Sequence, residues 1–334
     1  DQEEITIKRS KIRGEESFGM ICAEDEIGIG TSHDGIIVLP ADAVVGTPAK
    51  EYYHVKSDWV LEVDITPNRV DAASHYGVAR DLAASLMQAG IPCQLQKPSV
   101  DAFAVDRREG GIEVIVEDLA ACPRYSALTI RGVTVQESPE WLKNRLQVIG
   151  LRPINNIVDI TNYVLHETGH PLHAFDAAHI KGNEVVVRTL PEKTKFVTLD
   201  EQERELNERD LMICNSEEGM CIAGIFGGLH SGVTMETRDI FLESAYFHPT
   251  RVRKTARRHG LNTDSSFRFE RGADPNNTLY VLKRAAMLVK ELAGGTIEGE
   301  IRDIYPTPIE KARVTLTYKK IHSLIGKEIP AATV

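Results

Sequence analysis

Residues 156–176 constrain the fold more strongly than any other stretch of this chain. They place polar and ionisable side chains between apolar ones, namely Asp159, Thr161, Asn162, His166, Glu167, His170, His173 and Asp176. Gly169 is a poor helix residue, and Pro171 denies a continuing helix its N–H and clashes one turn back. A helix that runs through the whole stretch is therefore disfavoured.

Residues 166–170 also match the H-E-x-x-H pattern. On a helix, this pattern puts two imidazoles on one face around zinc, with the glutamate as base. Gly169 and Pro171 argue against such a helix. Two alternatives remain open: a turn whose histidines are partly solvated, and a metal-free pocket lined by Asn162 and His173.

Composition restricts the class of protein. The 334 residues are 42% hydrophobic and 26% charged, which is typical of two or three globular domains. A net charge of -10 gives no general attraction to nucleic acid or anionic membranes, so a local basic patch would stand out. Five cysteines without a C-x-x-C pair, and no apolar run of about 18 residues, favour a cytoplasmic protein without a membrane span. Both ends look cut, which predicts a fragment.

Local patterns predict the elements. Strands are expected at 5–7, 19–22, 35–39, 60–65, 112–116, 124–130, 185–188, 196–199, 211–214, 240–247, 267–272 and 314–318. Helices are expected at 71–88, after Ser138-Pro139 up to Gly150, at 276–293, and from about 319. Residues 92–110 have the proline and glycine content of a linker.

Glu243 lies in the middle of the apolar run 240–247. A buried carboxylate without compensation costs several kcal/mol, so this residue needs a partner or a ligand unless the run is the exposed face of an edge strand. The small residues of 222–228 indicate close backbone approach of a neighbouring strand or of a ligand.

Residues 251–259 carry cations and no acid. Arg251, Arg253, Lys254, Arg257 and Arg258 on a helix closed by Gly260 could face a phosphate backbone, as in tRNA binding. The alternative is a solvated face that nearby acids offset.

In sequence order, the motifs resemble those of the β subunits of bacterial phenylalanyl-tRNA synthetases. The matching stretches are Lys11–Gly14, Ser17–Met20, Ile65–Arg69, Val158–Tyr163, Gly169–Asp176, Ala223–Gly228, Thr255–Gly260, and Phe269–Gly272 with Asp274-Pro275. The likeness runs almost from end to end, which makes it far more specific than any single motif.

The resemblance implies an α+β multidomain fold: a partial OB-type β-barrel, a small α/β unit and a larger mixed α/β editing domain. The expected ranges are 1–50 for the C-terminal part of an OB-type tRNA-binding domain, 51–98 for the small unit, 99–111 for a linker, 112–295 for the editing domain, 296–311 for a second linker and 312–334 for the truncated start of a winged-helix-like domain.

By the same resemblance, the chain hydrolyses tyrosine mischarged onto tRNA(Phe). Catalytic roles fall to His173, Asn162 and Thr161, and substrate binding falls to Glu243, Ala223, Gly224, Thr263, Ser265 and Arg152. Glu243 would accept the tyrosine hydroxyl, and Arg152 would hold the tRNA 3′ end. Ser265 stands where relatives often carry alanine, which leaves pocket size and polarity open.

The implied partners are tRNA(Phe) and the synthetase α subunit, in an α2β2 heterotetramer. ATP and magnesium are expected only for that holoenzyme, and no cofactor or metal is expected in this fragment. Two other functions compete: a non-catalytic module that binds tRNA or aromatic amino acids, and a zinc hydrolase.

Overall fold

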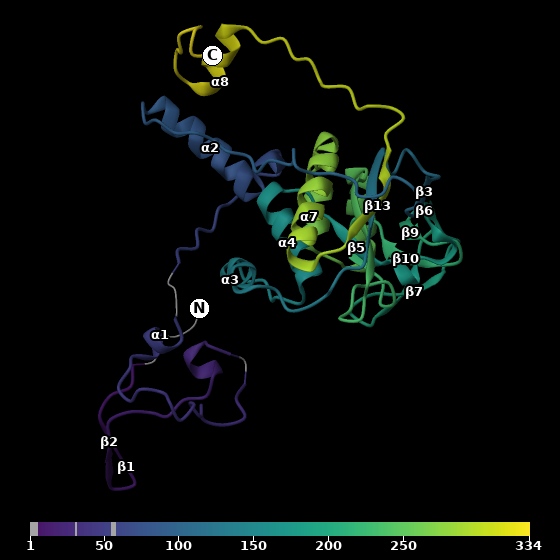
Figure 1. The fold of residues 1–334 in the computed structure, drawn as a ribbon. Helices are drawn as coiled ribbons and strands as arrows, with labels where there is room; N and C mark the ends of the chain where they lie inside the picture. Colours follow the sequence, from purple (N-terminus) through teal and green to yellow (C-terminus); the bar gives the residue numbers. More distant parts are fainter. Residues whose placement is uncertain (1–5, 31, 55–57) are drawn as a thin grey trace. The chain divides into compact units, whose positions relative to one another are not determined.

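A computed structural model describes residues 6–30, 32–54 and 58–334. The chain divides into two compact units, Asp1–Leu61 and Glu62–Val334 (Figure 1). No helix among the described residues combines the length and apolar content that crossing a membrane requires. The finer domain boundaries expected from the resemblance stay predictions.

The described part of the first unit has little regular structure. Strands β1 (Ser10–Ile12) and β2 (Glu15–Ser17) pair antiparallel, and two short helices follow, η1 (Asp25–Ile27) and α1 (Ala49–Tyr52). The predicted strands at 19–22 and 35–39 are wrong, and the one expected at 5–7 begins outside the described residues. The described part contains no closed sheet, so the OB-type barrel is not confirmed.

Two antiparallel or mixed sheets form the centre of the second unit. The four-stranded sheet has the order β13 (Thr296–Ile304), β4 (Arg124–Arg131), β12 (Asp239–Tyr246) and β5 (His173–Asp176). The five-stranded sheet has the order β11 (Phe226–Gly227), β10 (Gly219–Ile222), β9 (Leu211–Cys214), β6 (Glu184–Thr189) and β3 (Glu113–Val116). A separate hairpin joins β7 (Lys195–Val197) and β8 (Glu203–Glu205).

Helices α4 (Asn156–Thr168) and α7 (Thr278–Ala293) cover one face of the four-stranded sheet and pack side by side (Figure 1). Helix α3 (Glu140–Val148) packs against α4. Their buried residues share one core with Leu128, Ile130, Ile240 and Leu242 of the sheet. The remaining helices are α2 (His75–Gln88), α5 (Pro249–His259), α6 (Asp264–Phe269), α8 (Tyr318–Ile325), and the single turns η2 (Val70–Ala72), η3 (Ala177–His179), η4 (Lys181–Asn183) and η5 (Pro275–Asn277).

Strand β12 separates two cores because successive side chains of a strand point to opposite faces. Ile240 and Leu242 contact the helices, whereas Phe241 and Ala245 lie in the core between the two sheets. Glu243 follows the same alternation, so its side chain belongs to the face that looks toward the second sheet. The sequence therefore brings this carboxylate into the interior, and not onto an exposed edge.

Three other element predictions are wrong. Residues 60–65 form no strand, because no neighbouring strand in the described chain pairs with them. Residues 314–317 form no strand, and helix α8 begins at Tyr318 with Thr317 as its N-cap. Residues 267–272 do not form a strand but continue helix α6 and its end, because the Thr263 side chain and Ser266 form a capping box.

Candidate functional site

Helix α4 ends before the second histidine of the H-E-x-x-H match. Asn155 caps its start by accepting the N–H groups of Ile157 and Val158, and Gly169 ends it in a left-handed conformation with φ of 76°. His166 is on the helix, but His170 lies beyond it and packs edge-on against Phe269. The two imidazoles therefore do not share one helical face, and no group of three or more His, Cys, Asp or Glu side chains that the structure describes could hold a metal ion.

The chain after that helix end forms strand β5, which brings His173 beside Glu243. The two are register partners between β5 and β12, and Phe175 pairs with Phe241 on the same face. A cavity of about 270 Å³ opens here. It is lined by Asn162, Leu165, Pro171, Leu172, His173, Leu199, Cys221, Gly224, Ile225, Phe226, Gly227, Glu243, Thr263, Asp264, Ser265 and Phe269.

Glu243 is only 5% exposed and accepts a hydrogen bond from a buried tyrosine. The Tyr125 hydroxyl donates to Glu243 Oε2 at 2.6 Å. Burial raises the pKa of Glu243 to about 7, while the bond from Tyr125 acts in the opposite direction. Sequence reasoning predicted that this carboxylate needs a partner but missed Tyr125, because the two residues are 118 positions apart.

His173 is held as a neutral ring. Burial lowers its pKa to about 4, and its ring stacks edge-on against Phe175 with centroids 4.4 Å apart. Its Nε2 is covered and has no hydrogen-bond partner among the described residues. At neutral pH the ring therefore carries no charge and can accept a hydrogen bond at an unprotonated nitrogen, whereas burial disfavours its protonation.

Helix α4 contributes an amide to the cavity. Asn162 lines it, and its side chain forms no hydrogen bond within the described chain, so both ends of the amide are free for a ligand. Thr161 is buried and does not line the cavity; its hydroxyl donates to the Val158 carbonyl at 2.7 Å. Asn162 and His173 thus line the same cavity, whereas Thr161 lies outside it.

Two hydrogen bonds connect one wall of the cavity to the turn at Gly224. Thr263 donates its hydroxyl to the Ile225 carbonyl at 2.9 Å, and Ser265 donates to the Gly224 carbonyl at 3.0 Å. Gly224 has φ of 69°, and a Cβ there would lie 2.7 Å from Phe247 Cδ2. Glycine is therefore required both by the backbone and by the approach of the ring, and the Ser265 hydroxyl is engaged with the wall itself.

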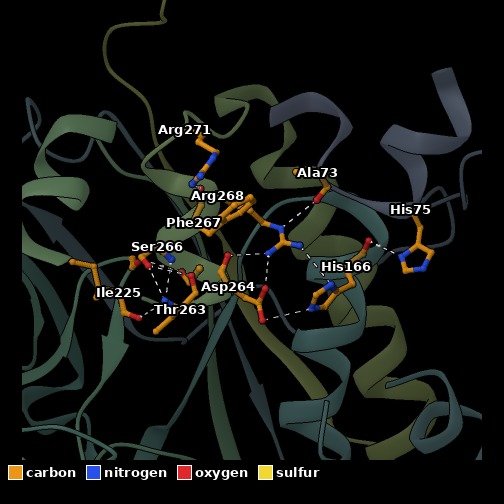
Figure 2. A network of polar contacts seen from close by, with 12 residues as sticks. Ala73, His75, His166, Ile225, Thr263, Asp264, Ser266, Phe267, Arg268 and Arg271 are labelled. Carbon is orange, nitrogen blue, oxygen red and sulfur yellow. Dashed lines mark hydrogen bonds and ion pairs between the residues drawn. The ribbon is translucent and has the colours of Figure 1, made fainter. Parts of the chain in front are cut away.

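Arg268 anchors the helix that carries this wall (Figure 2). It is 6% exposed, and its guanidinium donates to the Asp264 side chain at 3.1 Å, to the Asp264 carbonyl at 2.9 Å and to the Ala73 carbonyl at 3.3 Å. His166 Nδ1 lies 3.5 Å from its third nitrogen. Sequence reasoning assigned Arg268 to a strand and so missed this contact.

Besides Thr161, two of the predicted substrate-binding residues lie outside the cavity. Ala223 is buried in the core between the sheets and faces Leu211 and Val252 instead. Arg152 is exposed in the loop between α3 and α4. Neither lines the space around Glu243.

The five predicted cations of helix α5 differ in exposure. Arg253, Lys254 and Arg257 are exposed and form no ion pair within the described chain. Arg258 pairs with the buried carboxylate of Asp210, which also contacts His259 at 2.8 Å. Arg251 is half-buried. Only part of the basic patch is thus free for a partner.

Comparison with known proteins places part of the chain in a known domain family. The B3/4 domain matches residues 121–294. The chain is 71% identical over 330 residues to the phenylalanine–tRNA ligase β subunit of Bacteroides fragilis strain YCH46, covering 99% of this chain and 40% of that protein. It is 64% identical over 329 residues to the β subunit of Porphyromonas gingivalis, covering 98% of this chain and 40% of the relative. The crystal structure of an N-terminal fragment of the phenylalanyl-tRNA synthetase β subunit from Pyrococcus horikoshii is 16% identical with a TM-score of 0.40, over 80% of this chain and 72% of that one.

The chain thus spans about 40% of the length of the curated relatives it matches. The domain match extends over more than half of the chain and includes helices α3 to α7 and every residue that lines the cavity. It includes every strand of the two large sheets except β3 and β13. The chain therefore belongs to the B3/4 domain family, in the form found in phenylalanine–tRNA ligase β subunits.

Proposed function

We propose that this chain, as part of a phenylalanine–tRNA ligase β subunit, hydrolyses tyrosine that has been attached wrongly to tRNA(Phe). The observation that supports this most is the buried Glu243 carboxylate at the wall of a cavity, with Oε2 bonded to Tyr125 and no described residue donating to Oε1. Its relatives are named for a ligase whose amino acid differs from tyrosine by one hydroxyl.

The physical need for such a site follows from the chemistry of discrimination. An apolar pocket rejects an added hydroxyl by only on the order of 10²-fold. A second site that binds the hydroxyl and cleaves the ester supplies the remaining selectivity. Phenylalanine would leave the acceptor on Glu243 buried and unpaired, which is unfavourable, so this site favours tyrosine.

The proposed reaction is ester hydrolysis by water. Water adds to the ester carbonyl, the bond to the ribose oxygen breaks, and that oxygen leaves as the adenosine hydroxyl with a proton from the water. Tyrosine departs as a carboxylate and releases a proton to solvent. Asn162 and the neutral His173 would position the water, and Thr161 would support Asn162 from within α4.

Binding of tRNA extends the proposal beyond the cavity. Arg253, Lys254 and Arg257 would contact backbone phosphates, and the exposed Arg152 would hold the 3′ end. Residues 1–50 would add the OB-type tRNA-binding part. Charging of tRNA(Phe) with ATP would belong to the α2β2 assembly with the α subunit.

The test is deacylation of tyrosine-charged tRNA(Phe), with phenylalanine-charged tRNA(Phe) as the control substrate. Tyrosine is expected to be released faster, and Glu243→Ala and His173→Ala are each expected to slow that release by about tenfold or more. Glu203→Ala, which removes an exposed carboxylate on β8, serves as the matched control. Unchanged turnover in both cavity variants would refute the assignment.

A non-catalytic binding module remains the second candidate, and one feature of the cavity favours it. No described residue orients His173 by a hydrogen bond to Nε2, so no paired nucleophile and base is preassembled. Tight, salt-sensitive tRNA binding without loss of tyrosine from any charged tRNA would identify this module.

A further inference from the structure

Tyr125 and Glu243 form a phenol–carboxylate pair inside the molecule. Strands β4 and β12 pair antiparallel with Glu243 opposite Ala127 and Ala245 opposite Tyr125. Tyr125 is therefore the diagonal neighbour of Glu243 on the same face of the sheet, within reach of a long side chain. The tyrosine is fully buried, and its hydroxyl donates to Oε2 at 2.6 Å.

The other carboxylate oxygen has a different environment. Among the described residues none donates to Oε1, and this oxygen is not among the covered polar atoms that lack a partner. Because Glu243 lines the cavity, Oε1 is the atom that a ligand can reach. The carboxylate thus has one side bonded to the protein and one side open to the cavity.

The remaining titratable groups around Glu243 cannot replace Tyr125. His173 of β5 faces it as the register partner, and burial keeps that ring neutral by lowering its pKa to about 4. Cys122, which precedes β4, and Cys221 of β10 interact with the carboxylate, and burial raises the pKa of both thiols. No described cation forms an ion pair with Glu243, so the Tyr125 phenol is the group that stabilises its charge.

On the basis of the proposed function, we propose that Tyr125 is a positioning residue for the recognition of the substrate hydroxyl. Its phenol donates a hydrogen bond to Oε2 of Glu243, which orients Oε1 toward the cavity and favours the ionised form of the carboxylate. An ionised acceptor forms hydrogen bonds roughly twice as strong as a neutral one, so it is better suited to accept a second phenol. Tyr125 does not touch the substrate in this arrangement.

The experiment compares Tyr125→Phe with the unmodified chain, using tyrosinamide and phenylalaninamide as ligands in calorimetry across a pH series. The unmodified chain is expected to prefer tyrosinamide at high pH and to lose that preference as pH falls and Glu243 gains a proton. Tyr125→Phe is expected to move the midpoint upward by about one to two pH units and to weaken tyrosinamide binding at neutral pH by about tenfold or more.

Tyr246→Phe is the matched control, because Tyr246 ends the same strand β12 and its hydroxyl donates to no described residue. In a Glu243→Gln background, Tyr125→Phe should have no further effect on the preference for tyrosinamide. An unchanged midpoint and preference in Tyr125→Phe would overturn the proposal.

Two further measurements keep the result interpretable. If Tyr125→Phe fails to fold, 3-fluorotyrosine at position 125 keeps the shape while making the phenol a stronger donor, and the midpoint should then move downward. Carbon-13 NMR of the Glu243 carboxyl follows its titration without any ligand. If the unmodified chain shows no preference for tyrosinamide but Tyr125→Phe still shifts the Glu243 titration, the proposed function is refuted and the Tyr125 contact stands. If Tyr125→Phe leaves the Glu243 titration unshifted, the role of Tyr125 is refuted.

Discussion

At the scale of single residues, the buried carboxylate makes folding depend on pH. The pKa of Glu243 rises from 4.5 to about 7 on burial, so the folded state binds this proton more tightly than the unfolded state does. The stability of the fold is therefore expected to fall as pH rises from about 4.5 to about 7. Glu243→Gln removes that dependence.

The expected result is a gain in unfolding free energy for Glu243→Gln over the unmodified chain that is larger at pH 8 than at pH 4.5, by about 3 kcal/mol. Urea titrations at a series of pH values measure it, with Glu203→Gln on the exposed strand β8 as the control. Parallel pH profiles for Glu243→Gln and the unmodified chain would contradict the rise in the pKa of Glu243 on burial.

A second residue-scale prediction concerns the turn at Gly224. Gly224→Ala should destabilise the fold by about 2–4 kcal/mol, because φ of 69° strains an alanine and its Cβ meets Phe247 and Phe269 at under 3.0 Å. Gly150→Ala is matched, since Gly150 has φ of 82° but nothing within 4 Å. The smaller loss of stability expected for Gly150→Ala measures the cost of the backbone conformation alone. Equal losses of stability in the two variants would mean that the Phe247 and Phe269 rings move aside without cost.

At the scale of elements, helix α6 depends on one buried guanidinium. Arg268 donates to Asp264 and to the Ala73 carbonyl, and α6 carries the cavity wall formed by Thr263 and Ser265. Arg268→Lys keeps the charge but loses the planar fork. We expect about 1–3 kcal/mol lower stability and faster hydrogen exchange of the α6 amides.

Arg253→Lys is the control for that variant, because Arg253 is exposed on the neighbouring helix α5. Unchanged exchange in α6 after Arg268→Lys would mean that the capping box of Thr263 and Ser266 holds the helix without the arginine.

At the scale of the whole molecule, the charge distribution predicts which surface would make the proposed tRNA contact. The chain carries a net charge of -10, yet helix α5 exposes Arg253, Lys254 and Arg257 together. Replacing all three by alanine should weaken tRNA binding at low salt and reduce the slope of log affinity against log salt by up to about three. Filter binding over a salt series measures both quantities.

The control replaces Lys283, Lys311 and Arg313 by alanine, which changes the net charge equally at sites away from α5. If both triple variants lose affinity equally, general charge and not the α5 face governs binding. Arg258 is left unchanged in these variants, because its pair with the buried Asp210 makes it part of the fold.

Local sequence patterns determined the elements whose causes are local. Asp274-Pro275 before residues 276–293 and Gly294-Gly295 after them predicted helix α7, and the apolar run 240–247 predicted β12. Pro171 after Gly169 predicted that no helix joins His166 to His170. The need of Glu243 for a partner also followed from its position in an apolar strand. Each of these inferences depends on residues within a few positions of one another.

Only the tertiary structure decided what meets at the cavity. Tyr125 reaches Glu243 across 118 positions because β4 and β12 pair in a register that makes the two residues diagonal neighbours, and Arg268 reaches Ala73 because α6 packs beside that loop. The predicted strands at 19–22, 35–39 and 60–65 failed for the same reason, since a strand forms only where a neighbour supplies hydrogen bonds. The chemical groups of the site could thus be read from the sequence, whereas their partners depend on contacts that the packing of distant segments creates.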